Sequence, residues 1–172
     1  QSEITEQYAK DEATAAIFAG HDTVSSAIIF TLYALATHPK EQDKLHLELD
    51  EIFSDDKTRN VEFSDFPKLK FLECCIKESL RLYPASSLLG RASHTPLQLD
   101  KETIVPKGVV LWVSPWVTQR LPEFWPEPEE FKPSRFFYEN CVGRHPYSYI
   151  PFAAGPRNCI GQKLAYAVML TV

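Results

Sequence analysis

The longest hydrophobic stretch of the chain predicts a long helix near its N-terminal end. The helix is expected over about residues 4–37, and residues 13–36 within it are apolar nearly all round. A helix that is hydrophobic on every side is buried, either in a protein core or in a membrane. The length also suits a membrane span, but Asp22 lies in the middle, and an ionisable side chain at the centre of a bilayer is costly. The pattern therefore favours a buried core helix.

Two amphipathic helices are expected next. Pro39 suits the first position of a helix over about residues 39–53, whose polar face carries charged side chains. A polar loop over residues 54–60 then leads to a third helix, about 67–82. This helix ends before Pro84, because the residue that precedes a proline avoids the helical conformation.

The second half of the chain changes character. Residues 97–99 and 109–113 have the composition of short strands, and a Pro-Lys-Gly turn at 106–108 precedes the second of them. Residues 120–158 show no periodicity and alternate prolines with aromatic residues, and a loop of this length in a compact domain is usually functional. A last helix is expected over 161–172. Because its apolar run reaches the final residue without a cap or a breaker, we expect the chain to be cut there.

The composition agrees with one globular domain that buries a core. The 172 residues are 44% hydrophobic and 24% charged, which is typical of a globular protein. With the elements above, this predicts a mainly α fold with a small β-sheet, of the α+β class. The net charge is -5 and no basic stripe or arginine-rich run occurs, so no nucleic-acid partner is expected.

The four cysteines form no recognisable disulfide framework or zinc site. Cys74 and Cys75 are adjacent on a predicted helix, and no Cys-x-x-Cys spacing links them with Cys141 or Cys159. Taken singly, each cysteine is most simply a small buried hydrophobic residue. This usage favours a reducing compartment.

The decapeptide from Phe152 to Gly161, Phe-Ala-Ala-Gly-Pro-Arg-Asn-Cys-Ile-Gly, carries the clearest chemical signal. Cys159 stands at the start of a predicted helix, where unpaired N–H groups and positive potential favour a thiolate. Gly155 and Gly161 allow a tight turn or close approach to a large flat ligand. Phe152 could shield the sulfur, and Arg157 could pair with a carboxylate. The simpler alternative is a buried cysteine beside two turn glycines.

This decapeptide resembles the haem-binding loop of the cytochromes P-450, Phe-x-x-Gly-x-Arg-x-Cys-x-Gly, and matches it at every specified position. The resemblance implies that Cys159 is the proximal thiolate ligand of the iron of haem b. It also implies that Arg157 holds a haem propionate. A thiolate ligand pushes electron density onto the iron and favours O–O cleavage.

A second pair of motifs gains meaning from the same resemblance. Glu78 and Arg81 lie three apart on a predicted helix and can pair, although alone this is a common surface ion pair of little worth. The segment 131–136 resembles the family's segment before the haem loop, whose arginine joins the helix pair. The resemblance therefore implies a buried structural network of Glu78, Arg81 and Arg135, which fixes the long loop against the core.

The first helix carries a third motif, Ala19-Gly20-His21-Asp22-Thr23. A glycine and a threonine inside a helix permit a local opening, although a polar patch on a buried helix is the simpler reading. The stretch resembles the family's distal helix. By that resemblance Thr23 would hydrogen-bond dioxygen and an ordered water, and Asp22 would connect to the proton supply. Ala19 and Gly20 would face the haem and leave room for oxygen.

Two further positions are candidates for binding. Arg91 resembles the family's second propionate-binding arginine, against the alternative of an ordinary exposed arginine. Lys163, close to the ligand cysteine, is a candidate contact for an acidic redox partner.

The resemblance covers essentially the whole chain in the family's order of motifs. It implies that residues 1–172 are the C-terminal part of a single P-450 domain whose N-terminal half is absent, so we expect the isolated piece to be inactive. The motifs look most like those of eukaryotic microsomal forms, and are similar to the fatty-acid omega-hydroxylase branch and the sterol side-chain hydroxylases. Many omega-hydroxylases carry a glutamate that can attach haem covalently where Ala19 stands here, which argues against such a link.

The function implied is NADPH-driven monooxygenation, by dioxygen, of a lipophilic substrate such as a fatty acid, a sterol or a xenobiotic. The expected partner is an NADPH-dependent reductase. The expected location is the cytoplasmic face of the endoplasmic reticulum membrane, reached only through an N-terminal anchor absent from these residues. The alternatives are a haem-containing isomerase of the same fold, against which Asp22 and Thr23 argue, and a truncated, non-enzymatic product.

Overall fold

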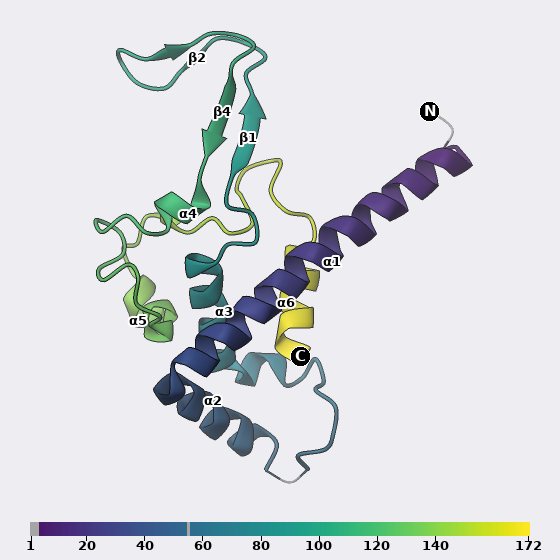
Figure 1. The fold of residues 1–172 in the computed structure, drawn as a ribbon, viewed down its shortest axis with the longest axis vertical. Helices are drawn as coiled ribbons and strands as arrows, with labels where there is room; N and C mark the ends of the chain where they lie inside the picture. The colour runs from purple at the N-terminus through teal and green to yellow at the C-terminus, as the bar shows by residue number, and fades with distance from the viewer. Residues whose placement is uncertain (1–3, 55) are drawn as a thin grey trace.

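A computed structural model describes residues 4–54 and 56–172 of the chain (Figure 1). The mainly α fold with a small amount of β-structure is confirmed. The elements in chain order are α1 (Glu6–Thr37), α2 (Pro39–Ile52), η1 (Phe66–Lys68), α3 (Lys70–Leu82), β1 (Leu89–Ala92), β2 (Leu97–Gln98), β3 (Ile104–Val105), β4 (Val110–Val113), α4 (Pro115–Thr118), η2 (Pro133–Phe136), α5 (Tyr138–Cys141), η3 (Pro146–Ser148) and α6 (Gln162–Thr171).

The long first helix forms as predicted. Thr5 caps its start, with its hydroxyl accepting a hydrogen bond from the N–H of Tyr8 at 3.2 Å. The prediction that this helix is buried is wrong for most of its length. Its buried residues are Ala27, Thr31, Ala34 and Leu35, all in its C-terminal half.

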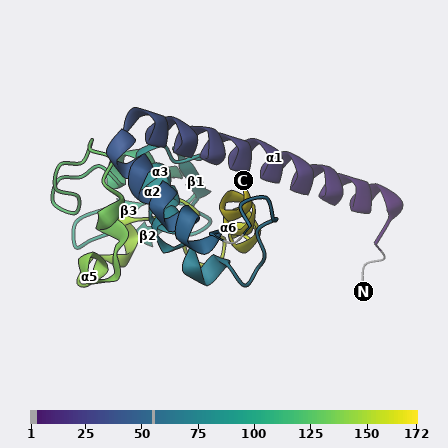
Figure 2. The same ribbon diagram turned by 90° about the horizontal axis from the view of Figure 1, so that it is seen from below.

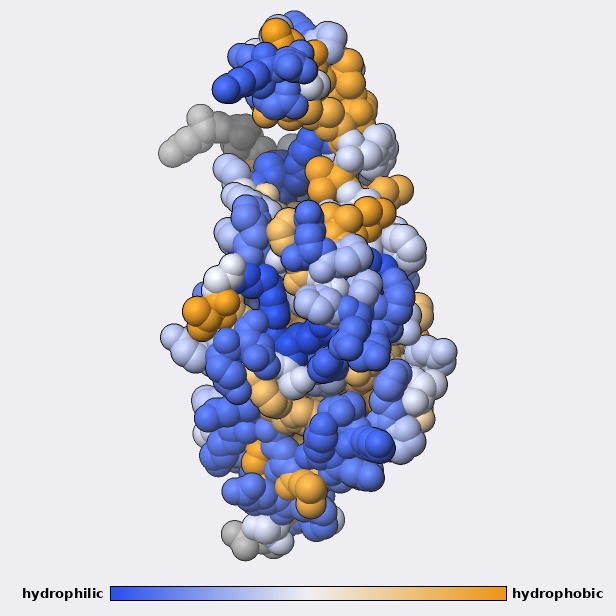
Figure 3. Space-filling view, turned by 90° about the vertical axis from the view of Figure 1, so that its left-hand side faces the viewer, coloured by the Kyte–Doolittle hydropathy of each residue, from blue (hydrophilic) through white to orange (hydrophobic). Residues whose placement is uncertain are grey.

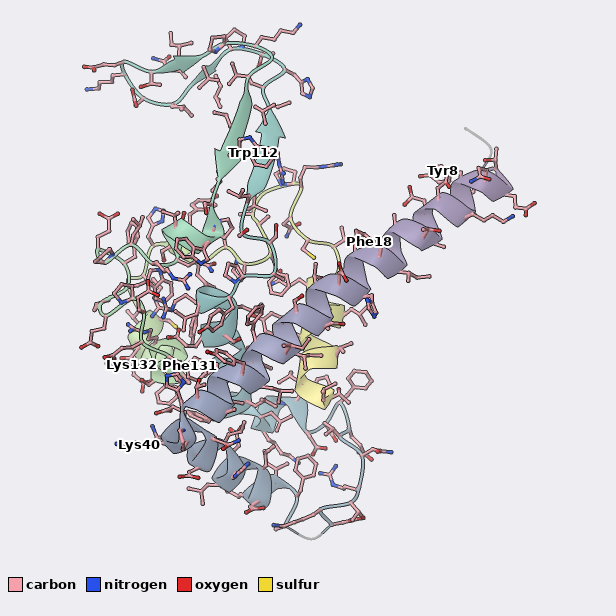
Figure 4. The ribbon with its side chains drawn as sticks, in the orientation of Figure 1. Tyr8, Phe18, Lys40, Trp112, Phe131 and Lys132 are labelled. Atoms are coloured by element: carbon pink, nitrogen blue, oxygen red, sulfur yellow. The ribbon has the colours of Figure 1, made fainter. Side chains whose placement is uncertain are left out.

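The reason is the reach of the neighbouring helices. Helices α2, α3 and α6 contact α1, and the N-terminal half of α1 extends beyond them (Figure 2). On that half Ile17 and Phe18 are each 72% exposed, and Figure 4 shows Tyr8 near the free N-terminal end of α1, far from the other elements. Among the described residues, α1 is the one helix long and apolar enough to cross a membrane, a test that core helices also pass.

The second and third helices agree closely with the predicted ranges. The third begins at Lys70 instead of residue 67, because the chain makes the short turn η1 and then leaves the helical region at Leu69, where ψ is 53°. The carboxylate of Glu48 on α2 accepts hydrogen bonds from the N–H groups of Phe71 and Leu72 at 2.6 and 3.0 Å. A glutamate from a neighbouring helix thus caps the first turn of α3.

The β-structure consists of two antiparallel pairs. Strand β1 pairs with β4, and β2 pairs with β3 at the tip of the same projection (Figure 1). The strands near residues 97–99 and 109–113 and the turn at 106–108 were predicted, whereas β1 and β3 were not. Figure 3 shows hydrophobic residues gathered at this projecting end, where Val110 and Trp112 are 51% and 65% exposed.

The long segment after β4 is not structureless. It contains α4, η2, α5 and η3, each of three or four residues, and turns this short leave no periodic pattern in a sequence. The segment packs on α3 through Cys74, Trp125 and Phe136. The last helix, α6, is present as predicted, and Ala165 and Met169 pack it against α1 and α3.

Candidate functional site

The helix α3 brings Glu78 and Arg81 together in the core. Arg81 donates to Glu78 through Nε at 2.8 Å and through Nη2 at 2.9 Å, and both side chains are fully buried. Arg135, from η2, donates through Nε to the same carboxylate at 3.2 Å. The N–H of Lys132 donates to Glu78 Oε1 at 2.9 Å. The three side chains that the motifs single out therefore meet at one carboxylate.

The two guanidinium groups also hold the backbone of the long segment. Arg81 donates to the carbonyls of Gln119, Pro128 and Glu130 at 3.0, 2.7 and 3.0 Å. Arg135 donates to the carbonyl of Pro126, and to that of Glu127 at 2.6 Å. Multiple donors in a fixed fork suit this role. As a result, residues 126–130 are held against α3 by charge-assisted hydrogen bonds.

Aromatic packing reinforces the same region. Trp125 is 1% exposed and lies between two guanidinium groups, 5.2 Å from Arg81 and 4.4 Å from Arg144. Its indole N–H donates to the carbonyl of Ser148 at 3.1 Å. No sequence motif singled out Trp125 or Arg144.

The loop around Cys159 is a closed turn that leads into α6. The N–H of Cys159 donates to the carbonyl of Phe152 at 2.9 Å, and the N–H of Asn158 donates to that of Gly155 at 3.1 Å. Gly155 has a φ of 80°, in the left-handed region that favours glycine. The side chain of Cys159 is exposed.

Phe152 anchors this loop. Its ring packs on Tyr166 of α6 at 5.4 Å between centroids, and it lies against the cluster that contains Ile76, Leu80 and Ala165. At the other end of the loop, Gly161 caps α6, and a methyl group built on it would lie 3.9 Å from the sulfur of Cys159. The cysteine is therefore held at a fixed place between the core and the first turn of a helix.

Strand β1 reaches the same loop. Arg91 donates through Nη2 to the carbonyl of Arg157 at 3.2 Å, and through Nη1 to that of Gly90 at 2.7 Å. Both arginine side chains belong to exposed residues. The Arg91 side chain is thus bonded to the backbone of the loop that carries Cys159, 66 positions further along the sequence.

The polar motif of α1 lies at the middle of the helix, just before the part that packs against its neighbours. Thr23 donates from its hydroxyl to the carbonyl of Ala19 at 2.7 Å. Asp22 lies 3.8 Å from the ring of His21, and its side chain is 73% exposed. Nothing lies within 4 Å of a methyl group built on Gly20. A hydrogen bond from a threonine hydroxyl to the carbonyl four residues earlier, as Thr23 makes here, often bends a helix.

The motif of α1 ends one helical turn before the contact of α1 with α6. Thr23 and Ala27 are four residues apart and share a helix face, and Ala27 packs against Ala165 of α6. Cys159 lies three residues before the start of α6. Among the described residues, no hydrogen bond joins Asp22 or Thr23 to the Cys159 loop; the two parts are related through the packing of α1 on α6.

The remaining cysteines lie apart from this loop. Burial raises the pKa of Cys74 to about 11 and raises that of Cys75 further. Cys141 is half-buried, with its sulfur 3.7 Å from a guanidinium nitrogen of Arg144. The expectation that Cys74 and Cys75 are buried thiols is confirmed, whereas Cys159 is the exposed one.

Comparison with known proteins gives one consistent result. The family model described as Cytochrome P450 matches residues 1–172. The chain is 44% identical over 156 residues to "Cytochrome P450 4c3" of Drosophila melanogaster, which covers 91% of this chain and 29% of that protein. It is 45% identical over 157 residues to "Cytochrome P450 4V2" of Homo sapiens (91% and 29%), and 39% identical over 170 residues to human "Cytochrome P450 4F8" (99% and 33%). The chain thus spans about a third of the length of these relatives.

Proposed function

Because this chain belongs to the cytochrome P450 family, we propose that it is the haem-binding, C-terminal part of a monooxygenase in which Cys159 ligates the iron. Residues 1–172 would form one continuous part of a single domain, and the rest of that domain would belong to a longer, complete protein. The observation that carries the proposal is the exposed cysteine in a closed turn that leads into a helix, with the exposed Arg157 in the same turn and the exposed Arg91 bonded to that turn.

The residues around Cys159 fit haem b. A thiolate is a suitable ligand for iron, and the exposed guanidinium groups of Arg91 and Arg157 suit two propionate groups. On α1, the residues Ala19 and Gly20 are exposed, and the open space around Gly20 would admit a flat ligand against the helix. When bound, haem supplies an iron centre for the activation of dioxygen, and its thiolate ligand favours O–O cleavage.

The chain's own groups then have distinct tasks. The hydrogen bond from the N–H of Cys159 to the carbonyl of Phe152 holds the sulfur in place. Phe152, which packs into the core, would limit access of water to one side of the loop. Gly155 and Gly161 keep the backbone close to the ligand, because neither carries a side chain.

Proton delivery is assigned to Asp22 and Thr23. The hydroxyl hydrogen of Thr23 is donated to the carbonyl of Ala19, so the Oγ1 lone pairs are left to accept a hydrogen bond from water. The carboxylate of Asp22 is largely exposed and can exchange protons with solvent. Together they would form a short path for protons from solvent to the substrate side of α1. Delivery of a proton along this path would be general acid catalysis.

The network of Glu78, Arg81 and Arg135 has a structural task in this proposal. It holds the segment before the cysteine loop against α3, so that the loop keeps its shape whether or not haem is bound.

The substrate we propose is lipophilic, with a fatty acid as the first candidate and a sterol or xenobiotic as the others. Exposed apolar side chains, among them Ile17 and Phe18, lie directly before the Ala19–Thr23 motif. An apolar wall beside the reacting centre suits a long alkyl chain.

We propose an NADPH-dependent reductase as the electron donor, with Lys163, exposed on the first turn of α6, as one contact. The cytoplasmic face of the endoplasmic reticulum membrane is the proposed location. If Lys163→Glu leaves reductase-supported turnover of the complete protein unchanged, this contact is wrong.

The function is tested with the complete protein, a reductase, NADPH and a series of fatty acids. Hydroxylated product is expected with the unaltered protein and none with Cys159→Ser. Product at an unchanged rate from Cys159→Ser would contradict the proposal.

A further inference from the structure

Gln119, which directly follows α4, is fully buried and uses every polar atom of its side chain. Its Nε2 donates to the carbonyls of Leu80 and Arg81, both at 3.1 Å. Its Oε1 accepts from the N–H of Ile150 at 2.9 Å. An amide side chain offers two donors and an acceptor, and here each has one buried backbone partner.

The donor side of Gln119 caps α3. The last four carbonyls of a helix have no partner within it, and at this end Tyr83 N–H supplies only the carbonyl of Ser79, at 2.7 Å. Gln119 supplies the next two, and Arg120 donates through Nη2 to the carbonyl of Leu82 at 2.6 Å. Two consecutive residues from a distant segment therefore complete the C-terminal end of α3.

The acceptor side of Gln119 holds the entrance to the cysteine loop. Ile150 lies two residues before Phe152, and its carbonyl accepts from the N–H of Ala153 at 3.1 Å. Ala153 has a φ of 60°, which is uncommon for a residue other than glycine. The carbonyl of Phe152 then accepts from the N–H of Cys159. These hydrogen bonds, joined by the backbone of Ile150 and of residues 152–153, connect the end of α3 through Gln119 to the cysteine.

We propose that Gln119 is a positioning residue for Cys159: by tying Ile150 to the end of α3, it sets where the sulfur stands relative to the core. This inference rests on the proposed function, since the position of the sulfur matters when it ligates iron. Removing the amide leaves the N–H of Ile150 and the carbonyls of Leu80 and Arg81 buried without partners, which is costly.

Neighbouring contacts explain why the effect is local. Ser148 is held through its carbonyl by Trp125, and Tyr149 donates from its hydroxyl to the carbonyl of Lys77 at 3.0 Å. Burial raises the pKa of Tyr149 well above its ordinary value, so this donor keeps its proton. Without Gln119, residues 148–149 remain attached to the core, and the change falls on the segment from Ile150 to Cys159.

The test uses the complete protein with haem bound and compares Gln119→Met with Arg120→Met. Arg120 caps the same helix end, and its other hydrogen bonds go to Glu129 and the carbonyl of Trp116 and not to the cysteine loop, so its variant controls for loss of a cap on α3 without loss of the link to that loop. The red-shifted ferrous–carbonyl band reports thiolate ligation, and far-ultraviolet circular dichroism reports global unfolding.

At a urea concentration below global unfolding, we expect Gln119→Met to lose the red-shifted band about tenfold faster than the unaltered protein. This is the size expected when the Ile150 N–H, the one of the three freed groups that belongs to the segment before Cys159, is left buried and unpaired. Arg120→Met is expected to lower the unfolding midpoint while its band is lost only together with global unfolding. If Gln119→Met behaves as Arg120→Met does, the residue caps α3 and does nothing further, and the inference is overturned.

A second measurement needs no variant. Amide hydrogen exchange of the unaltered complete protein, with and without haem, should show Ile150 N–H protected as strongly as the last amides of α3. Free exchange at Ile150 in the native state would overturn the inference even if Gln119→Met does not fold. An unaltered protein without any red-shifted band would contradict the proposed function itself, and this inference with it.

Discussion

Glu78 and Arg135 are 57 positions apart in the sequence, yet Arg135 Nε donates to Glu78 Oε1 at 3.2 Å in the core. Glu78 is fully buried, and the Arg135 side chain is 8% exposed. A buried ion pair adds little net stability over an apolar replacement, but the loss of one partner leaves an uncompensated buried charge. The contact therefore makes the fold of α3 and that of the segment before the cysteine loop depend on each other.

Glu78→Gln should strongly destabilise the complete protein. The carboxylate compensates two guanidinium groups, so its loss is expected to lower the free energy of unfolding by about 3–5 kcal/mol. Urea unfolding followed by circular dichroism measures this. Glu129→Gln is the matched control, because Glu129 pairs with Arg120 while its side chain is 72% exposed, and such pairs contribute little. Equal effects of the two substitutions would contradict the structural task assigned to Glu78.

Thr23→Ala should separate NADPH consumption from product formation. With the Oγ1 acceptor gone, proton delivery is impaired, and we expect several-fold less product for each NADPH consumed. Thr37→Ala is the control, because Thr37 makes the same kind of hydrogen bond within α1, to the carbonyl of Tyr33 at 3.0 Å. Unchanged coupling in Thr23→Ala would refute the role given to that hydroxyl.

Alkylation should distinguish Cys159 from the cysteines of α3. In the haem-free complete protein at pH 8, Cys159 is expected to react first. The pKa of Cys74 is raised to about 11 by burial, which leaves only about a thousandth of it as thiolate at that pH. Cys75 is buried as well and should react only after unfolding. Mass spectrometry of peptides after timed labelling gives the order, and labelling of Cys74 before Cys159 would be inconsistent with the structure.

The loop before α3 should respond to acid through Asp65. Arg59 donates to both carboxylate oxygens, at 2.7 and 3.0 Å, and this pair, together with the N–H of Glu62, holds the pKa of Asp65 well below its ordinary value. A depressed folded-state pKa gives stability that is present above the unfolded pKa of about 3.9 and is lost as the pH falls through the folded value. Arg59→Gln should therefore move acid unfolding to higher pH.

The control for this prediction is Lys57→Gln. Lys57 pairs with Asp50 and lowers the pKa of that carboxyl, but the side chain of Asp50 is 60% exposed, so the pair is screened by solvent. Circular dichroism between pH 5 and pH 2 measures both variants. An equal shift of the acid transition in both variants would mean that the contact between Arg59 and Asp65 stabilises the fold no more than the exposed pair of Lys57 and Asp50 does.

Local patterns in the sequence predicted the parts of this structure that depend on near neighbours. Pro39, Pro84 and the apolar spacing set the helices correctly, and the decapeptide from Phe152 to Gly161 identified the loop that the structure closes by its own hydrogen bonds. The meeting of Glu78 with Arg135 was expected from the family's motif alone, because nothing in the spacing links them.

The errors have a physical origin. Strand β1 contains Gly90 and Arg91 and has no apolar alternation. It forms because β4, about twenty residues later, pairs with it. The ring of Trp112 lies over Gly90, 3.0 Å from a methyl group built there. The exposure of α1 depends on how far other helices reach, which composition does not record. Gln119 carried no signal, because its three partners lie more than 30 positions away.

The ferrous–carbonyl absorption spectrum of the haem-loaded complete protein, compared with its Cys159→Ser variant, tests the central claim most directly. We predict a strongly red-shifted Soret band in the unaltered protein and the loss of that shift in the variant, as thiolate ligation by Cys159 requires. An unshifted band in the unaltered protein, or a shifted band that persists in Cys159→Ser, would contradict the assignment of Cys159 as the iron ligand.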